Sequence, residues 1–188
     1  QFGVHYTWLE ATFRSAEVLN GSANSSNDGP APGFDGNIRI APGDRLPLVP
    51  RQILKANIAW SPGESLTLQA DMQYIGDSLA RGNENGAHRA DGVYYLGPGR
   101  IGGYAVWNVG AEWRVHSRLS LYLQVDNALD RRYATAAQLG ATPFDATGTF
   151  AARPFAAPVI DGERPLWQGT FLAPGAPRFV LLGAKLRL

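Results

Sequence analysis

The sequence of 188 residues contains no cysteine, so disulfide bonds, thiolate metal sites and cysteine nucleophiles are excluded. The chain also has no large excess of positive or negative charge, because it contains 17 basic and 16 acidic side chains. That balance gives no indication of a polyelectrolyte partner such as a nucleic acid. No run approaches the roughly 18 consecutive apolar residues that a membrane-spanning helix needs. Any residence in a membrane must therefore be by β-strands.

Glycine and proline are abundant, at 22 and 13 residues, and aromatic side chains make up 11% of the chain. So many helix breakers argue against a helical bundle, and the aromatic content argues against a disordered tail. Six segments alternate apolar and polar residues with a period of two, which is typical of β-strands. They span residues 2–14, 46–60, 66–79, 104–115, 119–133 and 176–188. The sequence thus predicts an all-β, antiparallel, up-and-down sheet of about six long strands.

The connections between these segments alternate in length. Residues 61–65 and 116–118 form short turns, whereas the long stretches carry most of the glycine and proline, at residues 15–45, 81–100 and 136–175. One end of the predicted sheet therefore carries short turns and the other carries long loops. Outer-membrane β-barrels show this asymmetry, with short turns facing the periplasm and long loops facing outside.

The short turns also predict a register that sorts the side chains onto two faces. A hairpin closed by residues 116–118 places Trp113 opposite Leu121 on an apolar face. The turn at residues 61–65 is expected to place Lys55 opposite Asp71, as an ion pair on a polar face. Trp60 and Trp113 fall near the short-turn ends of their strands on the apolar face, at the height of an aromatic girdle. Ordinary core packing of these side chains is the alternative.

Length favours a membrane over a soluble fold. Alternation persists for 12 residues or more in each segment, whereas strands of globular proteins most often have about 5 or 6 residues. Six strands are too few to close a barrel, because single-chain outer-membrane barrels begin at about eight. We therefore expect further strands to precede Gln1 and the chain to be an excised piece of a longer protein. A soluble β-sandwich that binds carbohydrate is the second hypothesis, and a hydrolase on such a fold is the third.

Residues 125–133 read Val-Asp-Asn-Ala-Leu-Asp-Arg-Arg-Tyr. This run resembles the penultimate-strand signature of TonB-dependent outer-membrane receptors, commonly written Asn-Leu-Phe-Asp-Lys/Arg-x-Tyr. The matching residues are Asn127, Asp130, Arg131 and Tyr133. Residues 128–129 depart from the signature, because Ala-Leu stands where Leu-Phe is usual. Three further stretches follow the order of that family, at residues 45–51, 103–109 and 174–178.

The resemblance implies a plugged barrel of about 22 strands in a bacterial outer membrane, of which residues 1–188 form the C-terminal part. Such receptors import ferric siderophores, cobalamin or other scarce nutrients with energy from the TonB complex. The implied partners are outer-membrane lipid, the receptor's own upstream strands and plug domain, TonB through an N-terminal region, and the nutrient. The plug and the TonB-contacting region would lie upstream of this chain, so this segment alone is expected neither to transport nor to couple to TonB.

Charged side chains on the predicted polar face would line the barrel lumen and are candidates for contact with the plug. They are Lys55, Asp71, Glu112, Arg114, Asp126, Lys185 and Arg187. A solvated interior wall without a specific partner is the alternative. Asn127 and Asp130 are expected to close Asx-type turns where their strand leaves for the outer loops.

The outer loops carry candidates for ligand contact: Arg81, Arg89, Tyr94, Tyr95 and Trp167. Arginine can grip an anionic substrate or a lipopolysaccharide phosphate through paired hydrogen bonds, and the aromatic side chains can form a binding surface or simply pack the loops. The sequence shows no nucleophile motif, and its histidines, His5, His88 and His116, are far apart. We therefore expect no enzymatic activity, no metal site and no cofactor.

Overall fold

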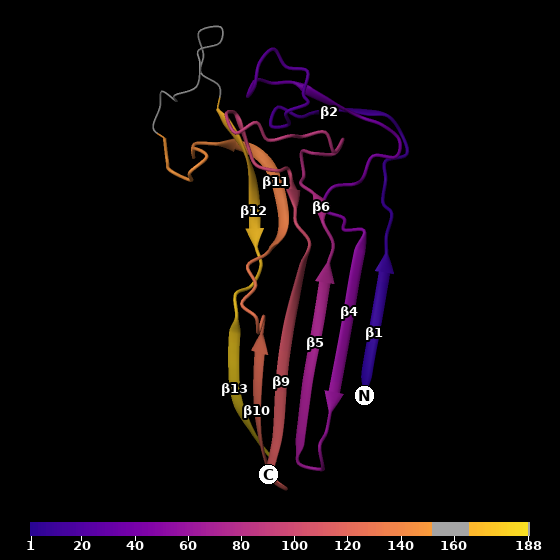
Figure 1. Cartoon of the computed structure of the whole chain (residues 1–188), viewed down its shortest axis with the longest axis vertical. Coiled ribbons are helices and arrows are strands. Elements are labelled where there is room, and N and C mark those ends of the chain that lie inside the picture. Colours follow the sequence, from indigo (N-terminus) through magenta and orange to yellow (C-terminus); the bar gives the residue numbers. More distant parts are fainter. Residues whose placement is uncertain (152–165, 188) are drawn as a thin grey trace.

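The computed structural model describes residues 1–151 and 166–187. Its main element is an antiparallel sheet of six strands in the order β1-β4-β5-β9-β10-β13 (Figure 1). These strands are β1 (Phe2–Trp8), β4 (Gln52–Trp60), β5 (Leu66–Ile75), β9 (Tyr104–His116), β10 (Leu119–Asp126) and β13 (Phe179–Leu186). The predicted all-β, antiparallel, up-and-down fold and its six long strands are confirmed. The sheet does not close, because β1 and β13 each pair with a single strand among the described residues.

The other strands gather at the end of the sheet opposite the short turns (Figure 1). They are β2 (Glu17–Asn20), β3 (Asn37–Ile40), β6 (Ser78–Leu79), β7 (Tyr95–Leu96), β8 (Arg100–Ile101), β11 (Ala134–Thr142) and β12 (Trp167–Pro174). We call these strands and the loops that join them the outer cap. The prediction that residues 15–45, 81–100 and 136–175 form loops without strands was therefore wrong in part, most clearly for β11 and β12, which pair over eight positions. No helix long and apolar enough to cross a membrane occurs in the described ranges.

The buried apolar residues all belong to the outer cap and not to the six-stranded sheet. In the part of the chain that the structure describes they are Ile38, Ile40, Leu79, Ala80, Tyr95, Ile101, Ala137 and Leu139. The apolar face of the sheet is open, with Leu182 75% exposed and Trp60 61% exposed. A soluble sandwich needs a second sheet packed over that face. No such layer covers it among the described residues, which argues against the sandwich hypothesis.

The register of the β9–β10 hairpin is as predicted over most of its length. Trp113 pairs with Leu121 on the apolar face, and Glu112 pairs with Tyr122 on the polar face. At the turn itself Leu119 pairs with His116, because an irregularity falls between Leu119 and the next residue. That bulge is local, so the faces remain as the alternation predicts.

The register of the β4–β5 hairpin differs from the prediction by two residues. Trp60 pairs with Leu68, and Lys55 pairs with Gln73, so the predicted Lys55–Asp71 ion pair is wrong. The first two residues of β5 continue beyond the last pair with β4 and pair with β9, which lengthens the turn. A shift of two leaves every side chain on its predicted face, and the apolar and polar faces are therefore unchanged.

Several predicted strands end earlier at the outer cap. The prediction carried one strand to residue 133, but β10 ends at Asp126, because Asn127 takes a left-handed φ of 49°. The strand predicted from residue 46 begins at Gln52, since Pro47 and Pro50 have no N–H to donate to a ladder. Backbone chemistry at these positions outweighs the alternation of the side chains.

Candidate functional site

The signature segment turns the chain sharply where β10 ends. Asn127 is 2% exposed, and its side-chain oxygen accepts the backbone N–H of Arg131 at 2.8 Å. Its side-chain amide donates to the carbonyl oxygens of Arg131 and Ala176, each at 3.0 Å. Its backbone N–H donates to Asn108 Oδ1 at 2.9 Å. A single buried side chain therefore joins the exit of β10 to β9 and to the segment that enters β13.

Two further signature residues hold the same region together. Asp130, with a left-handed φ of 52°, accepts the backbone N–H of Arg178 at 3.4 Å and lies 3.8 Å from its guanidinium group. The ring of Tyr133 stacks on Tyr104, with centroids 4.4 Å apart. Gly175 packs against Tyr133 so closely that a Cβ at this position would overlap the ring. The signature thus has a structural part in shaping the strand exit.

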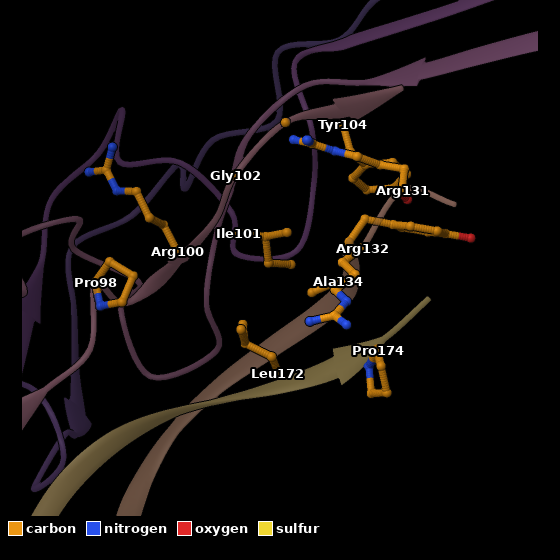
Figure 2. A pocket seen from close by; sticks show the side chains of 12 residues that line it. Pro98, Arg100, Ile101, Gly102, Tyr104, Arg131, Arg132, Ala134, Leu172 and Pro174 are labelled. Carbon is orange, nitrogen blue, oxygen red and sulfur yellow. The ribbon is translucent and has the colours of Figure 1, made fainter. Parts of the chain in front are cut away.

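A pocket with a volume of about 480 Å³ lies beside the tyrosine pair, and we call it the rim pocket. Three segments form its walls. They are residues 98–104, which lead into β9, residues 131–134, which follow β10, and the end of β12. Figure 2 shows Ile101 and Leu172 at its middle, Arg100 on one side, and Tyr104 on the other. Tyr104 starts β9 on the same face as Asn108, so the rim pocket borders the polar face of the sheet.

The charge around the rim pocket has one sign. Among the residues that the structure describes, Arg100, Arg131 and Arg132 line it, and no carboxylate does. The ion pairs among the described residues are Arg45–Asp77, Arg51–Glu10 and Arg178–Asp130. The three guanidinium groups of the rim pocket are exposed, and within the described ranges they have no hydrogen-bond or ion-pair partner. The pocket is therefore suited to an anionic group rather than a cationic one.

The charged residues predicted to line the lumen share the polar face of the sheet. Arg114 and Lys185 both pair with Ser120, from opposite sides of β10. Asp71 accepts a hydrogen bond from Asn108 at 3.0 Å, and Asp126 accepts one from the Gln124 amide at 2.9 Å. Glu112 pairs with Thr67 and Tyr122, Lys55 with Gln73, and Arg187 follows β13. The register brings these residues to one face without gathering them into a cluster.

The predicted outer-loop candidates are dispersed over the outer cap. Arg81 and Arg89 are exposed, whereas Tyr94 and Trp167 are half-buried. Tyr95 is 6% exposed, so its side chain belongs to the interior of the cap rather than to a binding surface. None of the five lines the rim pocket. In the described ranges, no group of three His, Asp or Glu residues is placed to hold a metal ion.

The sequence did not lead us to predict that Tyr104, Arg100 and Arg132 lie beside two of the signature residues. A signal for this site was present, because an antiparallel pair brings the start of one strand and the end of the next to the same end of the sheet. The run Arg131-Arg132-Tyr133 follows the end of β10, and Tyr104 stands at the start of β9. Their proximity follows from the hairpin that was predicted.

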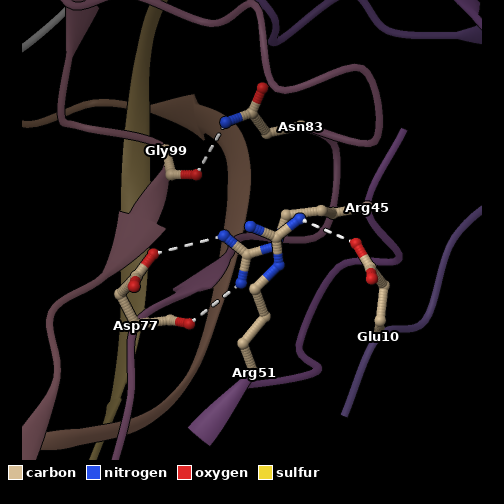
Figure 3. A network of polar contacts seen from close by, with 6 residues as sticks. All are labelled: Glu10, Arg45, Arg51, Asp77, Asn83 and Gly99. Carbon is tan, nitrogen blue, oxygen red and sulfur yellow. Dashed lines mark hydrogen bonds and ion pairs between the residues drawn. The ribbon is translucent and has the colours of Figure 1, made fainter. Parts of the chain in front are cut away.

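The outer cap is held by hydrogen bonds between its loops, and Figure 3 shows the one between Asn83 and Gly99. Asn83 donates to the carbonyl of Gly99 at 2.9 Å and accepts the backbone N–H of His88 at 3.1 Å. His88 Nδ1 accepts the backbone N–H of Ser25 at 3.2 Å, so Nε2 carries the proton and donates to the carbonyl of Gly97 at 2.9 Å. The neutral imidazole therefore joins the loop that follows β2 to the loop between β6 and β7.

Acid is expected to loosen this part of the cap. Burial lowers the pKa of His88 below its ordinary value of 6.5, and the positive charge of Arg89 acts in the same direction. The hydrogen bond to the Gly97 carbonyl and the charge of Asp91 oppose this shift without reversing it. Tyr95 packs edge-on against the imidazole. Because the unfolded loop binds the proton more readily, the stabilisation is complete above pH 6.5 and is lost as the pH falls toward the lower folded value.

The protection factors of the backbone amides at Ser25 and in the loop that carries His88, which compare each exchange rate with the intrinsic rate at the same pH, should therefore fall between neutral and mildly acidic pH. His88→Leu should exchange rapidly at both pH values, because it removes both imidazole hydrogen bonds. His116→Gln, in the exposed short turn, should keep the wild-type response. Equal protection factors of the wild-type cap at both pH values would contradict the assigned role of His88.

Comparison with known proteins gives one family match. The family described as "TonB dependent receptor-like, beta-barrel" matches residues 1–128, which is 128 of the 188 residues. The match covers β1, β4, β5, β9 and β10 and ends one residue after Asn127. No curated protein matches the chain.

Solved structures similar to this chain include three receptors. The siderophore receptor PiuA from Acinetobacter baumannii has 14% identity and a TM-score of 0.49, over 77% of this chain and 15% of its own. The closed form of the ferric-catecholate import receptor Fiu from E. coli K12 has 18% identity and a TM-score of 0.48, over 93% and 19%. The ferric yersiniabactin uptake receptor FyuA from Yersinia pestis has 17% identity and a TM-score of 0.48, over 84% and 21%. The chain thus spans about a fifth or less of their lengths.

Proposed function

Because the chain belongs to the TonB dependent receptor-like β-barrel family, we propose that it forms the C-terminal strands of an active uptake receptor in a bacterial outer membrane. The observation that carries this proposal is the open apolar face of the six-stranded sheet. In the complete barrel that face contacts lipid, and the polar face lines the lumen. Strands from outside this chain pair with the free edges of β1 and β13, because unpaired edges are not tolerated in lipid. A plug from outside this chain fills the lumen.

Transport in this proposal begins at the outer cap. A ferric siderophore or a similar scarce nutrient binds there, and TonB supplies energy through a region of the receptor outside this chain. The charged residues of the polar face, such as Glu112 and Arg114, contact the plug or the water around it. This chain supplies the wall and the rim of the path, and no catalytic step is assigned to it.

The orientation can be tested by labelling, because this chain contains no cysteine. Val18→Cys, 58% exposed in the outer cap, should react with a membrane-impermeant maleimide on intact cells. Ser117→Cys, exposed in the short turn, should react only after the outer membrane is permeabilised. The parent receptor with any native cysteines replaced is the control. Labelling of both positions on intact cells would contradict the proposed orientation.

Uptake can be tested in the same cells. The proposal predicts that cells carrying the receptor accumulate iron from at least one ferric chelate, and that accumulation ceases when TonB is removed. Accumulation that does not depend on TonB would overturn the proposal.

A further inference from the structure

We propose that the three outer loops of this chain form one cooperative unit that opens and moves as a single body. They are the first loop, residues 9–51, the second loop, residues 76–103, and the third loop, residues 127–178, of which residues 152–165 lie outside the described ranges. Surface loops commonly open separately, because few buried contacts hold them. In the outer cap, by contrast, interior contacts join the described residues of all three loops.

The second and third loops share an apolar interior. Ala80 and Ile101 of the second loop and Ala137 of the third form one packed cluster, each of them 5% exposed or less. The N–H of Arg81 donates to the carbonyl of Ala137 at 2.9 Å, and the N–H of Leu139 donates to the carbonyl of Arg81 at 2.8 Å. β7 of the second loop also pairs with β12 of the third. Separating these loops would therefore expose buried apolar side chains and break backbone hydrogen bonds.

A buried asparagine joins the first loop to the second. Asn24 of the first loop is 0% exposed, and its side-chain amide donates to the carbonyl of Gly82 at 2.9 Å and to Asn85 Oδ1 at 3.2 Å. Gly82 also borders the third loop, because a Cβ at this position would lie 3.0 Å from the Cβ of Leu139. One turn of the second loop therefore contacts both of its neighbours.

Two further contacts tie the first loop to the second at other points of the chain. The N–H of Ser25 donates to the imidazole of His88, as described above. Arg45 lies 3.4 Å from the carboxylate of Asp77 and donates to the Asp77 carbonyl at 3.2 Å (Figure 3). A single attachment would act as a hinge, whereas several attachments fix the orientation of the first loop on the second.

These contacts do not depend on strands or a plug outside this chain. The buried groups and the partners named above all belong to the described residues, so additional strands can cover the surface of the cap but cannot replace its interior. In the proposed function, on which this step rests, the nutrient enters the lumen past the outer cap. Its path should therefore open beside the three-loop unit and not between its loops.

Hydrogen exchange of the complete receptor in detergent tests the cooperative opening without reference to transport. Low concentrations of urea should speed exchange of the amides of β3, β8 and β11 with a common slope, because one opening exposes all three loops. Leu139→Ala, at a position that is 5% exposed, should lower the protection factors in all three loops by about tenfold or more, through a cavity in the shared interior. Leu172→Ala, 55% exposed in the same loop, is the matched control and should leave them unchanged. Different urea slopes in the three loops, or a loss confined to the third loop, would overturn the proposal.

Cross-linking tests whether the loops move as one body. Ser26 and Asn85 meet across the first and second loops, with 2.9 Å between the hydroxyl oxygen and the amide nitrogen. In the receptor with any native cysteines replaced, Ser26→Cys and Asn85→Cys can be joined by a short, reducible bis-thiosulfonate reagent. TonB-dependent uptake of radioactive iron from ferric citrate, a ferric tris-catecholate or a ferric tris-hydroxamate should proceed at the same rate before and after the two cysteines are joined.

A monofunctional thiosulfonate on the same two cysteines is the control for added bulk. Loss of uptake with the cross-linker but not with the monofunctional reagent would overturn the single body and leave the proposed function standing. No TonB-dependent uptake of any probe would overturn the proposed function instead, whereas a common urea slope would still support the cooperative unit.

Discussion

Leu123→Arg is expected to destabilise the complete barrel by about 2 kcal/mol, because Leu123 lies on the lipid face between the interface, where an arginine costs about 0–1 kcal/mol, and the bilayer midplane, where it costs about 2–4 kcal/mol. Leu123 stands in the middle of β10 and pairs with Ala111 on one side and Leu182 on the other. It lies one step along the apolar face from Leu121, the partner of the girdle residue Trp113. An arginine at this position cannot reach the lumen, because successive side chains point to opposite faces.

Gln124→Arg is the matched control, one residue further along the same strand on the polar face. Gln124 already donates a hydrogen bond to Asp126 at 2.9 Å, and an arginine can donate to the same carboxylate. Its effect should remain below about 1 kcal/mol, as expected of a lumen substitution. Chemical unfolding of both variants in lipid vesicles measures the difference. Equal destabilisation by the two arginines would show that the faces are assigned incorrectly.

The faces of the long strands could be predicted because the alternation of side chains has a period of two. The same period explains the error at the β4–β5 hairpin. Pairing Lys55 with Gln73 instead of Asp71 shifts the register by two and leaves the pattern of the faces unchanged. The choice between the two registers depends on where β5 passes the end of β4 and continues beside β9, which is a property of three strands rather than of one turn.

The outer cap was less accessible to prediction. The β11 sequence, Ala-Thr-Ala-Ala-Gln-Leu-Gly-Ala-Thr, has small residues and little alternation, so it carries a weak strand signal. It is ordered by long-range pairing with β12 and by Ala137 and Leu139, which are buried in the cap. His88 gives no local signal either, since its partners at Ser25 and Gly97 come together only in three dimensions.

The candidate site was also predicted only in part. The signature residues were recognised from sequence, and their turn-forming role was predicted from the chemistry of Asn and Asp side chains. The rim pocket needs Tyr104 and Arg100 as well, which precede the signature by more than twenty residues and belong to β9 and β8. The same segment therefore builds the strand exit and supplies two arginines to the pocket. A substitution that disturbs the strand exit is expected to disturb the pocket too.

Asn127→Ala tests the strand exit and should cost the complete barrel roughly 3 kcal/mol or more. The substitution removes three side-chain hydrogen bonds at a position that is 2% exposed, and each buried group left without a partner costs about 1–3 kcal/mol. Alanine also tolerates the left-handed φ of 49° less well than asparagine does. Chemical unfolding in lipid vesicles measures the loss.

Two further variants separate the effect of the lost hydrogen bonds from the effect of the left-handed backbone conformation. Asn127→Gly keeps the backbone conformation and loses the hydrogen bonds, so it should recover only the smaller, conformational part of the loss. Leu129→Ala is the local control, because Leu129 is 71% exposed within the same turn. An Asn127→Ala barrel as stable as the wild type would show that the strand exit does not depend on these bonds. If Asn127→Ala unfolds easily while Arg131→Gln does not, the strand exit depends on the Asn127 side chain and not on the Arg131 guanidinium group, since Asn127 bonds the backbone of Arg131 and not its side chain.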